Sequence, residues 1–295
     1  MPTRRDTFRL LAATVGIGLT TPIQAAFAQS GADLNVSPKR VVFAPDMRSA
    51  TVYVFNLGGA PASYSIGLVD RVMSADGQIR AVTDPSAQQE AATEIAKLRS
   101  AQPLVTFTPR RVILNPGQSQ VVRLRVLRPP ELANGEYRTH LTVTALPAED
   151  SGLTAEQAAG DPATSVVTRI NTLFSISIPL IVRQGPADVN CALENIAMTS
   201  RMDGGRRQAV LSLDLARKGG SSLFGDIEVR VAKAPKSAPP LGVVRGVGVY
   251  PEIDRRAIAI PLQLTPQSGD KLEVIFRDDD TKPGQALVVA SFSAP

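Results

Sequence analysis

Tryptophan is absent from this sequence, and cysteine and histidine each occur once among 295 residues. With Cys191 alone, the chain cannot form an internal disulfide, so its stability must come from packed cores. With His140 alone, neither a histidine-based triad nor a multi-histidine metal site can form within one chain. Four tyrosines and no tryptophan also leave little for an aromatic sugar-binding platform. We therefore expect no enzyme and no cofactor.

The residues that could still carry chemistry each have a simpler interpretation. Cys191 is interpreted as a small buried apolar residue, with an intermolecular disulfide as the alternative. His140 is interpreted as a surface or partly buried packing residue on a strand. The acidic segments Glu149-Asp150 and Asp278-Asp279-Asp280 lie in loop-like sequence and are typical of solvated turns. Glycosidic chemistry and calcium binding are the alternatives there.

Strong charge and long apolar runs are also lacking. The formal net charge is +5, to which Arg4, Arg5 and Arg9 against Asp6 contribute +2 (three minus one), leaving +3 for the rest. That surplus, without interleaved aromatic residues, argues against nucleic-acid binding. After the first 30 residues, no apolar run approaches the roughly 20 residues of a membrane span, so we expect no stable membrane insertion.

Residues 1–28 have the pattern of a cleavable export signal. Arginines precede an apolar run at residues 10–19, and Ala26-Phe27-Ala28 is a small-x-small cleavage site. The pattern predicts an exported chain that begins at Gln29. Both the general secretory and the twin-arginine routes stay open, because Arg4-Arg5 suggests the second while Phe8 lies one place late for that motif.

Short alternating segments separated by turn residues follow, which is typical of β-sandwiches. Asp76-Gly77 predicts a hairpin turn, and Asn115-Pro116-Gly117 predicts a type II turn. The helical spacing of Ala87, Ala91, Ile95 and Leu98 predicts one short helix in the first domain. The expected strands are 40–43, 50–56, 63–69, 104–107, 111–114, 120–127, 137–146, 192–198, 209–215, 227–232, 242–250, 257–264, 272–277 and 286–292.

We expect two domains, at residues 29–183 and 184–295, with the boundary at Gln184-Gly185-Pro186. The seven short strands after the boundary are typical of an immunoglobulin-like sandwich. Residues 147–164 hold almost no large apolar side chain and predict a long loop. The fold class is therefore all-β, with two tandem sandwiches.

The longest alternating stretch is residues 169–183, directly after that loop. Every second residue, beginning at residue 170, is mostly apolar, and the alternate residues include Arg169 and Arg183. Period two predicts a strand of fifteen residues, far above the usual length of about 5–6. Pro179 has no N–H for a ladder and suggests an edge or a bend. An exposed apolar edge of this length needs a covering partner. The residues on the mostly apolar face of this strand are Ile170, Thr172, Phe174, Ile176, Ile178, Leu180 and Val182.

Four stretches resemble the periplasmic pilus-assembly chaperones of the chaperone–usher type. They lie mostly within residues 34–183, and the second domain matches only in size and strand count. The four stretches are Asn35-Val36-Ser37-Pro38-Lys39-Arg40-Val41-Val42-Phe43, Thr108-Pro109-Arg110-Arg111-Val112 with Asn115-Pro116-Gly117-Gln118, Gly135-Glu136-Tyr137-Arg138-Thr139-His140-Leu141, and Ser177-Ile178-Pro179-Leu180-Ile181-Val182-Arg183.

The resemblance implies two immunoglobulin-like sandwiches in an L or boomerang arrangement, in the periplasm, with Arg183 at the interdomain hinge. It implies that the long strand completes pilin or fimbrial subunits by donor-strand complementation and that an outer-membrane usher receives them. By position, the plugs of the donor strand would be Ile170, Thr172, Phe174 and Ile176. A self-capping dimer of the free protein stays open.

The family binds the subunit's terminal carboxylate with an arginine on its first strand and a lysine on the donor strand. Arg40 fills the first position, since guanidinium pairs with carboxylates in bidentate fashion. The second falls at Pro179, so either Arg169 or another cation substitutes, or Arg40 is a single anchor. The alternative for Arg40 is a solvated strand end. The alternative function is a structural or adhesive cell-surface β-sandwich or a sugar-binding protein, and a hydrolase ranks below both.

Overall fold

The structure is a computed structural model, and it describes residues 33–147, 174–235 and 237–295. The expected export signal, most of the expected loop, and the candidate residues Arg169, Ile170 and Thr172 lie outside these ranges. In the described ranges, no helix is long and apolar enough to cross a membrane.

The first half contains most of the short strands and all of the helices in the described ranges. Its elements are β1 (Leu34–Ser37), β2 (Val41–Phe43), β3 (Ser49–Asn56), β4 (Ala62–Val69), β5 (Arg71–Met73), β6 (Ile79–Ala81), α1 (Pro85–Glu90), α2 (Ala92–Lys97), the 3-10 turn η1 (Gln102–Leu104), β7 (Val105–Thr108), β8 (Arg111–Leu114), β9 (Ser119–Val126), β10 (Gly135–Ala145) and β11 (Ser175–Gln184).

The second half is a run of longer strands. They are β12 (Cys191–Asp203), β13 (Arg206–Arg217), β14 (Leu223–Val231), β15 (Gly242–Val249), β16 (Arg255–Pro261), β17 (Lys271–Asp278) and β18 (Ala286–Ser293). Each corresponds to one of the seven strands expected after residue 184, so the sequence located all of them and missed only their ends.

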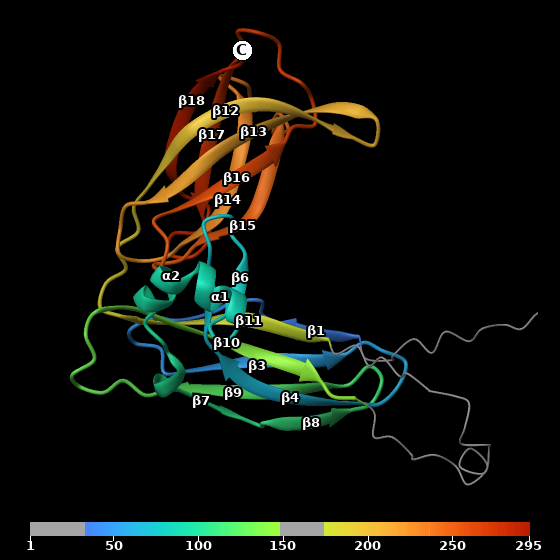
Figure 1. The fold of residues 1–295 in the computed structure, drawn as a ribbon, viewed down its shortest axis with the longest axis vertical. Coiled ribbons are helices and arrows are strands. Elements are labelled where there is room, and N and C mark those ends of the chain that lie inside the picture. Colours follow the sequence, from blue (N-terminus) through green and yellow to red (C-terminus); the bar gives the residue numbers. More distant parts are fainter. Residues whose placement is uncertain (1–32, 148–173, 236) are drawn as a thin grey trace, which may run out of the picture.

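Two sandwiches result, and they confirm the all-β fold class. The first packs the sheet β1-β3-β9-β7 against the sheet β2-β11-β10-β4-β8, and the second packs β12-β13-β16 against β15-β14-β17-β18. Figure 1 shows the second sandwich, in gold to red, standing across the end of the first in an L-like outline. Alternation builds each layer: along β9, Val122, Leu124 and Val126 are buried while Arg123 and Arg125 are exposed.

The opening strand divides between the two sheets of the first sandwich. β1 pairs with β3 in one sheet, whereas β2 pairs with β11 in the other. The chain crosses between them at Ser37-Pro38, a cis peptide bond. The expected first strand covered residues 40–43 only, so the sequence did not reveal this change of sheet.

The two halves are joined by more than the connection after β11. The β5-β6 hairpin reaches the second sandwich, where Met73 packs into the second core and the Ala257 N–H donates to the Ala75 carbonyl at 2.9 Å. Ile181 on β11 also belongs to that second core. The end of β11 is therefore buried on both faces, one in each sandwich.

Local signals were mostly predictive. Gly117 adopts a φ of +73° and the Gln118 N–H donates to the Asn115 carbonyl at 3.0 Å, as a type II turn requires. The expected single helix is two short ones, because the chain at Ala91 leaves helical geometry (φ −128°, ψ 31°). Asp84 caps the first helix by accepting from the Ser86 N–H at 2.9 Å.

Candidate functional site

The edge of the first sandwich is incompletely paired along β11. On one side β11 pairs with β10 along its whole length, from Gly135 opposite Gln184 to Thr144 opposite Ser175. On the other side β2 covers only Leu180 to Val182. Among the described residues, no strand pairs with the backbone of Ser175 to Pro179 on that side. We call this segment the open edge.

The hydrogen-bonding groups of the open edge follow from the register. The Ala145 N–H donates to the Phe174 carbonyl at 2.8 Å, which makes 145 and 174 a hydrogen-bonded pair. Bonding alternates along antiparallel strands, so even-numbered residues of β11 face β10 and odd-numbered ones face outward. The open edge therefore presents two N–H groups, of Ser175 and Ser177, to an incoming strand. It also presents three carbonyl groups, of Ser175, Ser177 and Pro179. Because Pro179 is one of the outward-facing residues, its missing N–H interrupts no bond to β10, and the pairing with β10 continues past it.

The side chains of β11 confirm the predicted alternation within the described part. Ile178, Leu180 and Val182 are buried in the first core, and Ile176 is partly buried against it. Phe174 precedes the strand and its side chain is 51% exposed. The expected fifteen-residue strand is therefore ten residues long where it is described, and residues 169–173 lie outside the described ranges.

Arg40 lies where the open edge stops. It immediately precedes Val41, the residue of β2 that pairs with Leu180. Its Nη2 bonds to the Asp280 carboxylate at 2.9 Å and to the Ser222 hydroxyl at 3.3 Å, and its guanidinium stacks on the Phe224 ring at 4.5 Å. The side chain is 12% exposed, so the solvated strand-end interpretation is wrong. Its Nε and Nη1 have no hydrogen-bond partner in the described ranges.

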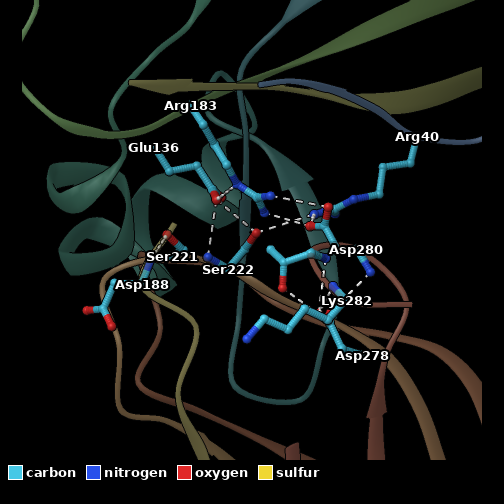
Figure 2. Close-up of polar contacts among 10 residues, drawn as sticks. Arg40, Glu136, Arg183, Asp188, Ser221, Ser222, Asp278, Asp280 and Lys282 are labelled. Atoms are coloured by element: carbon cyan, nitrogen blue, oxygen red, sulfur yellow. Dashed lines mark hydrogen bonds and ion pairs between the residues drawn. The ribbon is translucent and has the colours of Figure 1, made fainter. Parts of the chain in front are cut away.

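A buried ion network joins the two sandwiches beside Arg40 (Figure 2). Arg183 on β11 binds Asp280 through both terminal nitrogens, at 3.2 and 2.6 Å, and donates from Nε to Glu136 on β10 at 3.2 Å. Glu136 in turn accepts from the Ser222 N–H at 3.2 Å and the Ser222 hydroxyl at 3.0 Å. Arg183 thus bridges a carboxylate of each sandwich, which fixes their relative orientation.

The loop that carries Asp280 is itself tightly held. The Asp278 carboxylate accepts from the backbone N–H groups of Asp280, Thr281 and Lys282 at 3.1, 3.0 and 2.6 Å. Burial alone would raise the pKa of Asp280, but hydrogen bonds from Arg183 and the charge of Arg40 outweigh it, so its pKa is lowered. The interpretation of this acidic segment as a solvated turn is therefore wrong for Asp278 and Asp280. Both carboxylates have structural partners.

A second ion pair spans the two halves deeper in the molecule. Arg138 on β10 bonds to Glu252 just after β15, and both side chains are almost fully buried. Glu252 also accepts from the Met73 N–H at 3.0 Å, and the Arg138 guanidinium lies 3.9 Å from the centre of the Tyr250 ring. Arg138 is therefore committed to the interface.

His140 lies between these charges and the open edge. It is opposite Pro179 on one side and Val69 on the other, and it is 2% exposed. Neither ring nitrogen has a hydrogen-bond partner in the described part of the chain. Burial lowers the pKa of His140 to about 2, and the positive charges of Arg138, Arg71 and Arg40 add to the shift. The expectation of a surface or partly buried side chain is wrong.

Cys191, at the start of β12, is buried in the second core. Burial raises the pKa of its thiol to about 11, so it remains protonated at neutral pH. In the described ranges, no group of three or more histidine, cysteine and acidic side chains has the geometry of a metal site.

The sequence singled out Arg40 and Arg183 but missed their partners. Glu136, Asp280 and Ser222 lie far apart in the chain, and no local pattern marks them. The only hint was an acidic run beside a turn, at Asp278 to Asp280. Arg138 and Glu252 were missed for the same reason.

Comparison with known proteins gives matches only among solved structures. No family model matches the chain, and no curated protein matches it. Similar structures include the Pseudomonas aeruginosa CupB2 chaperone, at 12% identity and a TM-score of 0.43 over 88% of this chain and 100% of that one. The E. coli chaperone DraB shares 14% identity with a TM-score of 0.42, over 90% and 97% of the two chains. Another is the Acinetobacter baumannii CsuC–CsuE chaperone-tip adhesion subunit complex, at 12% identity and a TM-score of 0.42, over 88% and 98%.

The likeness covers both halves of the chain but is distant.

Proposed function

We propose that the chain is a periplasmic chaperone that binds unfinished immunoglobulin-like pilus subunits by strand addition at the open edge. The observation that carries this proposal is the unpaired backbone of Ser175 to Pro179, with Arg40 at its end. A strand edge with unpaired N–H and carbonyl groups is a template for another strand.

Backbone pairing would supply generic affinity. The open edge offers two N–H groups and three carbonyls, and a net contribution of about 1 kcal/mol for each bond gives roughly 5 kcal/mol before ordering costs. Such bonds do not depend on the side chains of the incoming strand, so one chaperone could bind several subunits of similar shape.

Side chains ahead of the open edge would supply selectivity. Phe174 is half exposed, and we propose that it fills a pocket of the subunit together with Ile170, Thr172 and Ile176. If each large side chain buries about 100 Å², each contributes about 2.5 kcal/mol. Ile176 is the weakest of the four in this role, because it already packs against the first core.

Arg40 would fix the end of the incoming strand. A strand that runs parallel to β11 along the open edge ends with its carboxyl terminus beside Arg40, because β2 occupies the edge from Leu180 onward. A cation at that position favours a terminal carboxylate. Arg169 is the other anchor proposed from the sequence.

The remaining elements of the proposal follow from this role. Residues 1–28 would be the export signal, and 29–183 and 184–295 the two domains, with Arg183 at their hinge. The bound subunit would pass to an outer-membrane usher, and no catalytic step is involved. A second copy of the chain could cover the open edge when no subunit is bound.

Co-expression with an immunoglobulin-like subunit encoded beside this gene tests the proposal. Changing Ile170, Phe174 and Ile176 together to Ser should abolish the co-purified complex and lower the subunit yield. The matched control changes Ile113, Leu127 and Leu264 to Ser; these side chains are 71%, 56% and 69% exposed and lie away from β11. Intact complex formation by the first variant would refute strand donation.

A further inference from the structure

The outward side of the sheet β1-β3-β9-β7 holds several apolar side chains that are exposed. Tyr53 on β3 is 44% exposed, and its ring stacks on that of Phe55 with the ring centres 6.2 Å apart. Val54 between them is buried in the first core, so both rings lie on the outward side. Exposed apolar side chains that gather on one face mark an interaction site, whereas scattered ones need no explanation.

Apolar residues continue past the ends of these strands. Ser49 on β3 is opposite Arg125 on β9. Met47 and Leu127 lie two residues further along the two chains and are 37% and 56% exposed, and Leu57, just after β3, is 55% exposed. Four of the eleven large apolar side chains that are exposed in the described ranges therefore lie along these two strands.

The same face carries cations and no carboxylate. None of its four strands contains an aspartate or a glutamate. Arg123 and Arg125 are exposed on β9, and neither has an ion pair with any residue of the described ranges. Lys39, just after β1, donates to the side chain of Asn35, which lies opposite Phe55. Six further outward-facing residues carry hydroxyl groups, namely Ser37, Ser49, Thr51, Thr106, Thr108 and Ser119.

The size of this surface indicates which kind of anion complements it. We call it the cationic face; it comprises the outward-facing residues of the four strands with Met47, Leu57 and Leu127. It is roughly 33 Å long from Met47 to Leu57 and about 15 Å wide across the strands, hence about 500 Å². A stable protein–protein interface buries roughly 800 Å² on each partner. The cationic face is smaller than that, whereas a lipid surface requires no minimum area.

The chemistry of the cationic face matches the headgroup region of an anionic bilayer. Arginines near such a surface are attracted to it, and serine and threonine hydroxyls can donate to the phosphate oxygens. Tyrosine is enriched at this depth, because its ring is apolar and its hydroxyl is hydrated. Exposed apolar side chains beside the arginines add burial at the boundary with the acyl chains.

We propose that the cationic face binds the surface of an anionic phospholipid bilayer. Arg123 and Arg125 contact the phosphates, while Tyr53, Met47 and Leu127 insert at the boundary between headgroups and acyl chains. The binding is peripheral, and no strand crosses the bilayer. The open edge lies on the other sheet of the sandwich, so a chain bound in this way keeps that edge free, and the inference does not depend on strand addition.

The absence of tryptophan from the sequence permits a specific test. Tyr53→Trp places a single tryptophan on the cationic face, and the control Ile113→Trp places one at a 71% exposed position of the other sheet. Both proteins begin at residue 29, without the apolar run at residues 10–19. With vesicles of mixed phosphatidylglycerol and phosphatidylcholine, we expect the emission of Tyr53→Trp to shift to the blue and that of Ile113→Trp to stay unchanged. Vesicles of phosphatidylcholine alone and inorganic phosphate should shift neither.

Sedimentation with the same anionic vesicles tests the arginines. Arg123→Gln combined with Arg125→Gln should lower the partition coefficient about 25-fold, about fivefold for each charge. The matched control combines Arg201→Gln with Arg207→Gln; it removes the same charge from exposed positions of the second sandwich and should leave the partition coefficient nearly unchanged. Added salt should weaken binding of the wild type.

The inference is wrong if anionic vesicles leave the emission of Tyr53→Trp unshifted. A shift with poly-glutamate or with a single-stranded oligonucleotide would then identify an acidic protein or a nucleic acid as the partner. A shift that grows with protein concentration in the absence of vesicles would identify a second copy of the chain instead. Equal losses in the two double variants would mean that net charge, rather than this face, attracts the vesicles. Subunit capture at the open edge is measured separately and is unaffected by these results.

Discussion

His140 should make the folded protein sensitive to acid in a way that a single substitution removes. The ring is 2% exposed, and burial together with Arg138, Arg71 and Arg40 lowers its pKa to about 2. In the unfolded chain its pKa is about 6.5. Between these values the unfolded chain binds one more proton than the folded chain, so stability decreases as the pH falls.

The size of the effect follows from linkage. Each pH unit below the unfolded pKa removes about 1.36 kcal/mol, so the loss between pH 7.5 and pH 4.5 is about 2.7 kcal/mol. Over this range the folded ring stays neutral, because its pKa lies well below 4.5. Asp280 acts in the same direction, because its pKa is also lowered. Its stabilisation is lost as the pH falls through the range below the ordinary carboxyl pKa.

Urea unfolding of the wild type and His140→Gln at several pH values is the assay. The difference between the two curves cancels the carboxylates, which titrate equally in both proteins. We expect the wild type to lose about 2.7 kcal/mol relative to the variant between pH 7.5 and pH 4.5. A constant difference across that range would refute the buried neutral ring. The NMR signal of this one histidine in the wild type gives an independent measurement, and it should show no protonation above pH 4.5.

Three further predictions concern the interface, the edge and a turn. Arg183→Met should destabilise the protein by about 3–5 kcal/mol in urea unfolding, because it leaves the buried Glu136 without a cation and the buried Asp280 with Arg40 alone. The control Arg80→Met breaks the exposed pair with Glu90 and should leave stability nearly unchanged. Arg40→Ala should weaken subunit capture by about 2 kcal/mol or more, measured by titration calorimetry, and an unchanged affinity would dismiss this anchor. Gly117→Ala should lower the free energy of unfolding by about 1 kcal/mol, because the φ of Gly117 is +73°. The control Gly59→Ala should leave this free energy nearly unchanged, because Gly59 has neither a positive φ nor a neighbouring atom within 4 Å of an added Cβ. Equal effects of the two substitutions would contradict the turn assignment.

Local sequence determined most of the longer strands of this protein, but β1, β5 and β6 were not among the expected strands. Alternation along residues 120–127 and 137–146 predicted β9 and β10, and the residues around Gly117 predicted the turn between β8 and β9. These signals are reliable because neighbours in the chain decide them: side chains alternate along a strand, and only glycine readily adopts a positive φ. The apolar face of β11 could be predicted from the sequence for the same reason.

Tertiary structure decided which part of β11 is free and what surrounds it. The change of sheet at Pro38 leaves the edge unpaired from Ser175 to Pro179, and residues 40 and 41 mark where it stops. The burial of Arg183 and Asp280 likewise depends on packing between the two sandwiches, because these partners lie 97 positions apart in the chain. A charged side chain looks the same in a sequence whether it is solvated or paired, because its environment is set by contacts that no local pattern encodes.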